Sequence, residues 1–273
     1  MNKFTLNLLY CGSLVFILIG GFGCSSSQEV AQLTVEKRFE AAVKIFTNGD
    51  FREAYEEFKI ITLQFQGSSL ADDAQYYMGE CQASREDWLL AAYEYETLVR
   101  SLPTSEFVAR ARYKIALCYY KRSPKSVLDQ NDTKKAIDEF QSFIEYHPSD
   151  SLVKDAENKI KELVNKLAKK EFESGVIYMR MQYYKSAINS FDYVLEKYYD
   201  TQYADQAQLK KAEALLLRQR AAEAKKEIEK FFLKYPSSSL TVEGEKLKQE
   251  IEIQYAAFLK NPPKVSSDSL LVK

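Results

Sequence analysis

The chain has 273 residues, a formal net charge of −1 and a pI near 6.1. Proteins that bind nucleic acid usually carry basic surfaces that neutralise phosphates, so nucleic acid is not expected as a partner. Nine glycines and six prolines leave little material for strands and turns, and a hydrophobic content of 46% is ordinary for a globular chain. The composition therefore favours an all-α protein.

The N-terminus has the order of a secretion signal. Lys3 gives a positive start, residues 6–19 are largely apolar, and small residues precede Cys24. This order resembles a bacterial lipoprotein signal. The resemblance implies that residues 1–23 are a signal peptide, that Cys24 carries acyl chains, and that residues 24–30 form a tether. A removed secretory peptide with an incidental Cys24 is the alternative, whereas a permanent membrane span is disfavoured because about 20 apolar residues are needed.

A small residue recurs along the rest of the chain, and each copy is followed by an alanine with a bulky apolar residue four positions later. The small residues are Ala42, Gly79, Ala116, Gly175 and Ala212, and the following pairs are Ala54 with Phe58, Ala91 with Tyr95, Ala136 with Phe140, Ala187 with Phe191, and Ala224 with Ile228. Small side chains let two antiparallel helices approach closely, and the bulky residue shares the face of its alanine. Repeat spacings of 37, 37, 59 and 37 residues are close to the roughly 34-residue tetratricopeptide period. The sequence predicts a superhelix of five helix hairpins.

The first three hairpins are expected in residues 31–148. Their helices are predicted at 31–47 and 51–65, at 70–84 and 87–101, and at 106–121 and 132–146. Proline cannot continue a helix, so Pro103, Pro148 and Pro236 should follow helix ends. The connection from Arg122 to Asn131 is longer than the other hairpin turns. It is interpreted either as a loop on a binding face or as a tolerated surface insertion.

The second part of the fold is expected in residues 149–260. Residues 151–182 contain no proline and carry regularly spaced apolar residues, which predicts one long helix that projects beyond the stack or joins two halves. Further helices are predicted at 184–198, 203–219 and 221–235, with a C-terminal capping helix at 239–259. Residues 261–273 contain two adjacent prolines and several serines, and a disordered tail is expected there.

The sequence contains no pattern that indicates catalysis, a metal site or a cofactor. The only histidine, His147, precedes Pro148 at a repeat turn, where a structural role is expected. Cys81 and Cys118 occupy equivalent repeat positions and are predicted to be buried free thiols. Acidic residues alternate with lysines, as is usual on solvated helix faces. We therefore expect no enzyme activity and no cofactor.

Function is expected to come from the surface formed by the first helix of each hairpin. Aromatic residues recur on these helices, and the candidates for a peptide-binding groove are Phe39, Phe46, Tyr76, Tyr113 and Tyr120. Rigid rings bury area at low entropic cost, which suits an extended or aromatic-tipped peptide. Packing between repeats explains the same pattern equally well.

The order of signal, five hairpins, insertion and long helix resembles the BamD family of outer-membrane β-barrel assembly lipoproteins. Local likeness includes His147-Pro148-Ser149, Leu167-Ala168-Lys169 and Asp200-Thr201-Gln202. The resemblance implies a lipid-anchored protein on the periplasmic face of the outer membrane. It further implies that the C-terminal half docks on the barrel-inserting subunit and that the N-terminal half reads C-terminal segments of unfolded outer-membrane proteins.

The resemblance is incomplete at one position, because a basic docking residue of familiar members would fall near Asp205, which is acidic. The alternative function is that of a periplasmic tetratricopeptide adaptor for cell-envelope or peptidoglycan enzymes.

Overall fold

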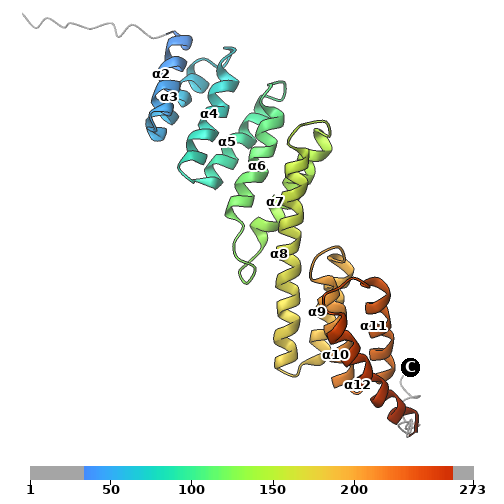
Figure 1. Ribbon diagram of the computed structural model, residues 1–273. Helices are drawn as coiled ribbons and strands as arrows, with labels where there is room; N and C mark the ends of the chain where they lie inside the picture. The colour runs from blue at the N-terminus through green and yellow to red at the C-terminus, as the bar shows by residue number, and fades with distance from the viewer. Residues whose placement is uncertain (1–33, 261–273) are drawn as a thin grey trace, which may run out of the picture.

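The computed structural model describes residues 34–260, which form eleven α-helices and no strand (Figure 1). In chain order they are α2 (Val35–Thr47), α3 (Phe51–Gln64), α4 (Ala71–Ser84), α5 (Trp88–Ser101), α6 (Val108–Arg122), α7 (Asn131–Tyr146), α8 (Val153–Arg180), α9 (Tyr184–Lys197), α10 (Ala204–Leu217), α11 (Ala221–Lys234) and α12 (Thr241–Lys260). The predicted signal peptide 1–23, the tether 24–30 with Cys24, and the tail 261–273 lie outside the described residues. The predicted all-α fold of five helix hairpins with a C-terminal capping helix is confirmed.

The small residues lie where two helices of a hairpin cross. A Cβ atom added to Gly79 would lie 2.4 Å from Cε1 of Tyr95, and one added to Gly175 would lie 2.5 Å from Cε1 of Phe191. Carbon atoms that are not bonded to each other cannot approach so closely, since their favourable separation is about 3.5–4.0 Å. Glycine therefore allows these two helix pairs to cross at the observed separation, as the sequence predicts.

The hairpin turns also repeat. Gly49, Glu86, Gln182 and Gln219 each adopt a left-handed backbone conformation, with φ angles of 91°, 61°, 61° and 60°. Each lies two positions after the last residue of the first helix of its hairpin. The third hairpin has the eight-residue loop 123–130 in place of this tight turn. The expected insertion thus replaces the tight turn that the other four hairpins share.

The three prolines that the sequence predicts after helix ends lie where they are expected. Helices α5, α7 and α11 end at Ser101, Tyr146 and Lys234, and the prolines Pro103, Pro148 and Pro236 each come two residues later. At each end the backbone N–H of the next residue still donates to the helix, as His147 does to the carbonyl of Phe143 at 2.9 Å. The helix thus completes its last hydrogen bond before proline stops it.

Each helix packs chiefly on the helices before and after it in the chain, so the buried residues form five clusters along the stack. The 28-residue α8 is about 42 Å long. Leu163 and Leu167 in its middle pack with α7, while Phe172 and Val176 further along pack with α9. As Figure 1 shows, α8 joins the two groups of helices, and it is two residues shorter at each end than predicted.

The capping helix α12 begins like the first helix of another repeat. Gly244 occupies the same repeat position as Ala111 and Ala207, 37 residues after the latter, and a Cβ atom added to it would lie 2.9 Å from Cε1 of Phe231. Leu247 and Ile251 continue the buried face against α11. The stack therefore ends on half a repeat.

Candidate functional site

The first two groove candidates lie together in the first hairpin. Phe39 and Phe46 are half-buried and contact the ring of Tyr77, with centroids 5.8 and 5.5 Å away. Tyr77 also stacks on Phe58 at 5.1 Å, which joins the pair to the core of the repeat. Tyr77, which sequence reasoning missed, is therefore the residue that brings the two predicted rings into one cluster.

The third candidate, Tyr76, is buried between repeats. Its side chain is 6% exposed, and its ring stacks on Phe107 with centroids 4.7 Å apart. Burial, together with the nearby Glu80 carboxylate, raises the pKa of Tyr76 well above its ordinary value. Tyr76 thus packs the second hairpin against the third, which is the packing alternative left open by the sequence.

Tyr113 and Tyr120 tie α6 to α8. Tyr113 is 8% exposed, and its hydroxyl donates to the Asp155 carboxylate. Tyr120 is half-buried, its hydroxyl donates to Glu162 at 2.7 Å, and Nζ of Lys159 lies 4.8 Å from its ring centroid. Burial and the Glu162 carboxylate raise the pKa of Tyr120 to about 12.

The five groove candidates therefore belong to three packing clusters. The clusters contain Phe39 and Phe46, then Tyr76, then Tyr113 and Tyr120. Only Phe39, Phe46 and Tyr120 keep substantial exposed surface. The groove stays a prediction, and its accessible part is restricted to these three rings.

A buried carboxylate network recurs in the second and fifth hairpins. Glu94 accepts from Nε2 of Gln75 and from the hydroxyl of Tyr55, each at 2.8 Å. Glu227 accepts from Nε2 of Gln208 at 2.7 Å, and each Gln–Glu pair is nineteen residues apart. The Gln side chains also donate to the backbone carbonyls of the same glutamates. Charged residues on a helix face are usually solvated, so sequence reasoning did not pair these side chains.

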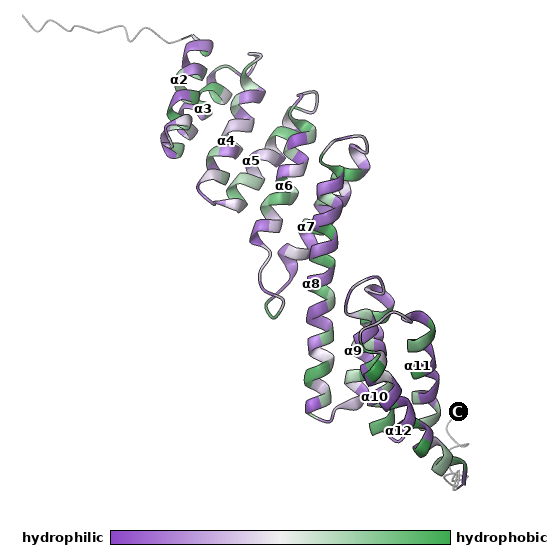
Figure 2. Cartoon of the chain, viewed as in Figure 1, coloured by the Kyte–Doolittle hydropathy of each residue, from purple (hydrophilic) through white to green (hydrophobic). Residues whose placement is uncertain are grey.

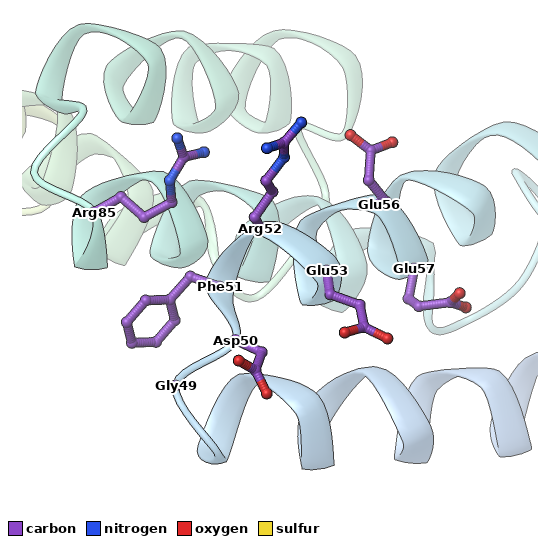
Figure 3. A pocket seen from close by; sticks show the side chains of 8 residues that line it. All are labelled: Gly49, Asp50, Phe51, Arg52, Glu53, Glu56, Glu57 and Arg85. Atoms are coloured by element: carbon purple, nitrogen blue, oxygen red, sulfur yellow. The ribbon is translucent and has the colours of Figure 1, made fainter.

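A pocket of about 560 Å³ lies at the turn between α2 and α3. Figure 3 shows that Arg52 and Arg85 point to one side of the turn while Asp50 and Glu53 point to the other. These side chains diverge, so they do not surround one common point as the groups of a catalytic centre must. The pocket is part of the surface that the first hairpin shares with the turn of the second.

The predicted buried thiols are confirmed. Cys81 and Cys118 are buried and unpaired, and burial raises the pKa of each to about 12. Among residues 34–260, no three His, Cys, Asp or Glu side chains are grouped so that they could hold a metal ion. No helix in the same range combines the length and apolarity that a membrane span requires.

His147 has a structural environment. Its ring lies against Phe143, with centroids 5.8 Å apart, and its buried Nε2 atom has no hydrogen-bond partner within residues 34–260.

Stacked hairpins of this kind form solenoids with extended surfaces, and the chain is a helical-repeat protein of the tetratricopeptide type. Over residues 31–227 it matches the family YfiO, described as an outer membrane lipoprotein, and it belongs to that family. This match, together with the relatives named below, confirms the resemblance to the BamD family.

Several relatives carry the name outer membrane protein assembly factor BamD. The chain is 26% identical to that of Rickettsia prowazekii (strain Madrid E) over 240 residues, which cover 85% of this chain and 93% of the relative. It is 22% identical to that of Vibrio cholerae serotype O1 over 194 residues, which cover 67% and 80% of the two chains.

Two solved tetratricopeptide structures align with most of this chain at low similarity. The TPR2AB domain of yeast Sti1, solved in a pHSP90 complex, aligns over 83% of this chain and 86% of its own, with a TM-score of 0.41 and 15% identity. A thermophilic tetratricopeptide protein of Thermus thermophilus aligns over 82% and 98%, with a TM-score of 0.34 and 14% identity.

Proposed function

We propose that this protein is an outer-membrane lipoprotein of the β-barrel assembly machinery. In this role it is a periplasmic scaffold that docks the barrel-inserting subunit and helps to recognise and insert unfolded outer-membrane proteins. The observation that carries the proposal is the family match over residues 31–227, which includes four hairpins and most of the fifth. The relatives named as assembly factors support it, because they align over most of their own length.

The membrane attachment in this proposal is the acylated Cys24. The described structure begins at Thr34, ten residues later, and ten residues span at most about 35 Å. Acyl chains at Cys24 would therefore hold the first hairpin near the membrane surface, and more than one chain makes such attachment stable. Cys24→Ala should move the protein from the membrane to the soluble fraction, and continued membrane retention would refute the anchor.

The client-binding surface in this proposal is the half-buried cluster of Phe39, Phe46 and Tyr77. Peptides with an aromatic C-terminus should crosslink to a photoreactive residue placed beside Phe39. Tyr76→Phe serves as the control, since it keeps the buried ring but removes the hydroxyl. Crosslinking that survives Phe39→Ala and Phe46→Ala in a folded protein would count against this surface.

The test of the overall role is the identity of the partner that copurifies with the membrane-held protein. A β-barrel insertase recovered in stoichiometric amount is the expected result. Depletion of this protein should also lower the amount of folded barrel proteins in the outer membrane. Recovery of cell-wall synthases without an insertase would favour the adaptor alternative and overturn the proposal.

A further inference from the structure

The loop 123–130 between α6 and α7 is held in one conformation by a buried side chain. Gln130 is 4% exposed, and its Nε2 donates to the carbonyls of Lys125 at 2.9 Å and Leu128 at 3.0 Å. Its Oε1 accepts from the hydroxyl of Thr133 at 2.7 Å. A buried amide that satisfies the carbonyls of its own loop fixes the loop backbone. This loop is therefore an ordered element of the surface.

The loop is also fastened to α8. Nζ of Lys166 donates to Oγ of Ser123 at 2.8 Å, and Nζ of Lys170 donates to the carbonyl of Leu128 at 2.6 Å. Despite this order, the tip of the loop is apolar and exposed, with Val127 73% and Leu128 56% accessible. Figure 2 shows the tip as a green segment next to purple turns of α8. Several hydrogen bonds thus hold an apolar tip in solvent.

Figure 1 shows that the second half of α8 continues beyond the loop. A pocket of about 420 Å³, lined by Val127 of the loop tip and by residues of α8, lies there. Phe172 and Val176 form its floor, since both are partly buried against the α9 cluster. Val127 and the 53% exposed Ile177 stand at its edge with Arg180. We name the loop tip and this pocket together the α8 step.

Basic side chains surround the α8 step. A second pocket of about 520 Å³ adjoins it, because Val127 and Glu173 line both. Together the two pockets are lined by five basic residues, Lys125, Lys166, Lys169, Lys170 and Arg180, against two acidic ones, Glu162 and Glu173. Among residues 34–260, neither Lys125 nor Arg180 forms an ion pair. The step is thus positively charged on a chain whose net charge is −1.

We infer that the α8 step is a docking site for an acidic segment of another polypeptide. The segment places an aliphatic or aromatic side chain in the pocket between Val127 and Ile177, and its flanking carboxylates face Lys125 and Arg180. An apolar anchor in a pocket supplies most of the affinity of such contacts, while complementary charge selects the partner and speeds association. This inference goes beyond the proposed function, because it requires neither the lipid anchor nor the client-binding cluster.

The test uses the full chain in mild detergent and two fluorescein-labelled synthetic peptides. Both have a Leu-Phe-Leu core, flanked by glutamates in one and by lysines in the other. The glutamate peptide should bind at least about tenfold more tightly, and Val127→Ser with Ile177→Ser should weaken it by at least about tenfold, as expected for loss of an anchor. Equal binding of the two peptides, or undiminished binding to the double variant, would overturn the inference.

A double variant with reversed charge distinguishes docking at this site from non-specific binding of the peptides. Lys125→Glu with Arg180→Glu should reverse the preference in favour of the lysine peptide, since both side chains are exposed and the substitutions invert their charge. Leu233→Ser is the matched control, because Leu233 is 82% exposed on α11. A preference for the glutamate peptide that persists in the reversed variant would also contradict the inference.

Discussion

Asp205 accepts a hydrogen bond from the hydroxyl of Ser238 at 2.6 Å, and this bond ties the start of α10 to the turn before α12. An equivalent bond runs from Ser105 in the turn before α6 to Asp72 in α4 at 2.7 Å, and both pairs are 33 residues apart. Ser238 Oγ in turn accepts from the backbone N–H of Leu240 at 3.1 Å. The carboxylate at position 205, where the resemblance would place a basic docking residue, thus has a structural partner within the chain.

Asp205→Ala should lower the free energy of unfolding by about 1 kcal/mol, because a hydrogen bond to a charged group is lost at a half-buried site. Amide hydrogen exchange should accelerate at the start of α12, while α4 and α5 remain protected. Asp72→Ala is the matched variant, and its effect should appear at the start of α6 instead. Unchanged exchange in α12 would contradict the structural role of Asp205.

Gly175→Ala should destabilise the fourth hairpin by about 1–2 kcal/mol, since the added Cβ atom meets the buried Phe191 ring and overpacking outweighs the gain in helix propensity. The fifth hairpin combines Ala212 with the smaller Ile228, so Phe191→Ile should make room for the alanine. In urea unfolding, Gly175→Ala should cost at least about 1 kcal/mol less in the Phe191→Ile background. Gly67→Ala, which adds a Cβ atom with nothing within 4 Å, is the control.

Glu227 should make stability depend on acidic pH. Burial alone would raise its pKa, but hydrogen bonds from Lys230, Gln208 and Lys211 lower the pKa below the ordinary 4.5. A group with a lowered folded-state pKa stabilises the protein above its unfolded pKa, and this contribution is lost as the pH falls through the folded pKa.

Glu227→Gln should therefore be less stable than the parent by about 1–2 kcal/mol at pH 7, and the difference should shrink below about pH 4.5. Chemical unfolding at a series of pH values measures the difference. The exposed Glu229→Gln should show neither effect. A difference that is independent of pH would rule out the ionised carboxylate as its source.

The left-handed turns predict opposite effects for two substitutions. Gln182→Gly should raise stability by up to about 1 kcal/mol, since glycine adopts φ near 61° without steric cost. Gly49→Ala should lower stability by a similar amount, although the space around Gly49 is open, because its φ of 91° strains any side chain. Thermal unfolding measures both, and the same sign for the two variants would contradict this account.

Gln130→Ala should loosen the loop 123–130, because the carbonyls of Lys125 and Leu128 lose their buried donor. Limited proteolysis should then cut within the loop at protease concentrations that leave the parent intact. The exposed Gln66→Ala is the control. Equal resistance of Gln130→Ala and the parent would show that the loop does not depend on this side chain.

The hairpins were predictable because their determinants are local and periodic. A glycine at 79 or 175 and a ring sixteen residues later define a close helix crossing, and the prolines mark where helices end. The sequence also indicates that α12 begins as the first helix of another repeat, since Gly244 follows Ala207 by 37 residues. At all these positions, the spacing of residues along the chain agrees with the side-chain size that the helix packing requires.

The surface was less predictable, because one period describes both the buried and the exposed face of a repeat. Tyr76 and Phe39 recur at equivalent positions, yet Tyr76 is covered by Phe107 while Phe39 stays half-exposed at the first repeat. The hydrogen bonds of the Glu94 carboxylate were equally hard to predict, since its partners Tyr55 and Gln75 come from two other helices. Such contacts depend on the crossing of helices, which no single helix face reveals.

Because α8 belongs to both groups of hairpins without a break, its length fixes the angle and the distance between them. One residue inserted between Leu167 and Phe172 would rotate everything from α9 onward by about 100° and displace it by about 1.5 Å along the axis. Every helix would still form and every hairpin would still close. The two groups of helices would nevertheless face in a different direction relative to each other. Binding of a partner that contacts both groups would therefore depend directly on the length of α8.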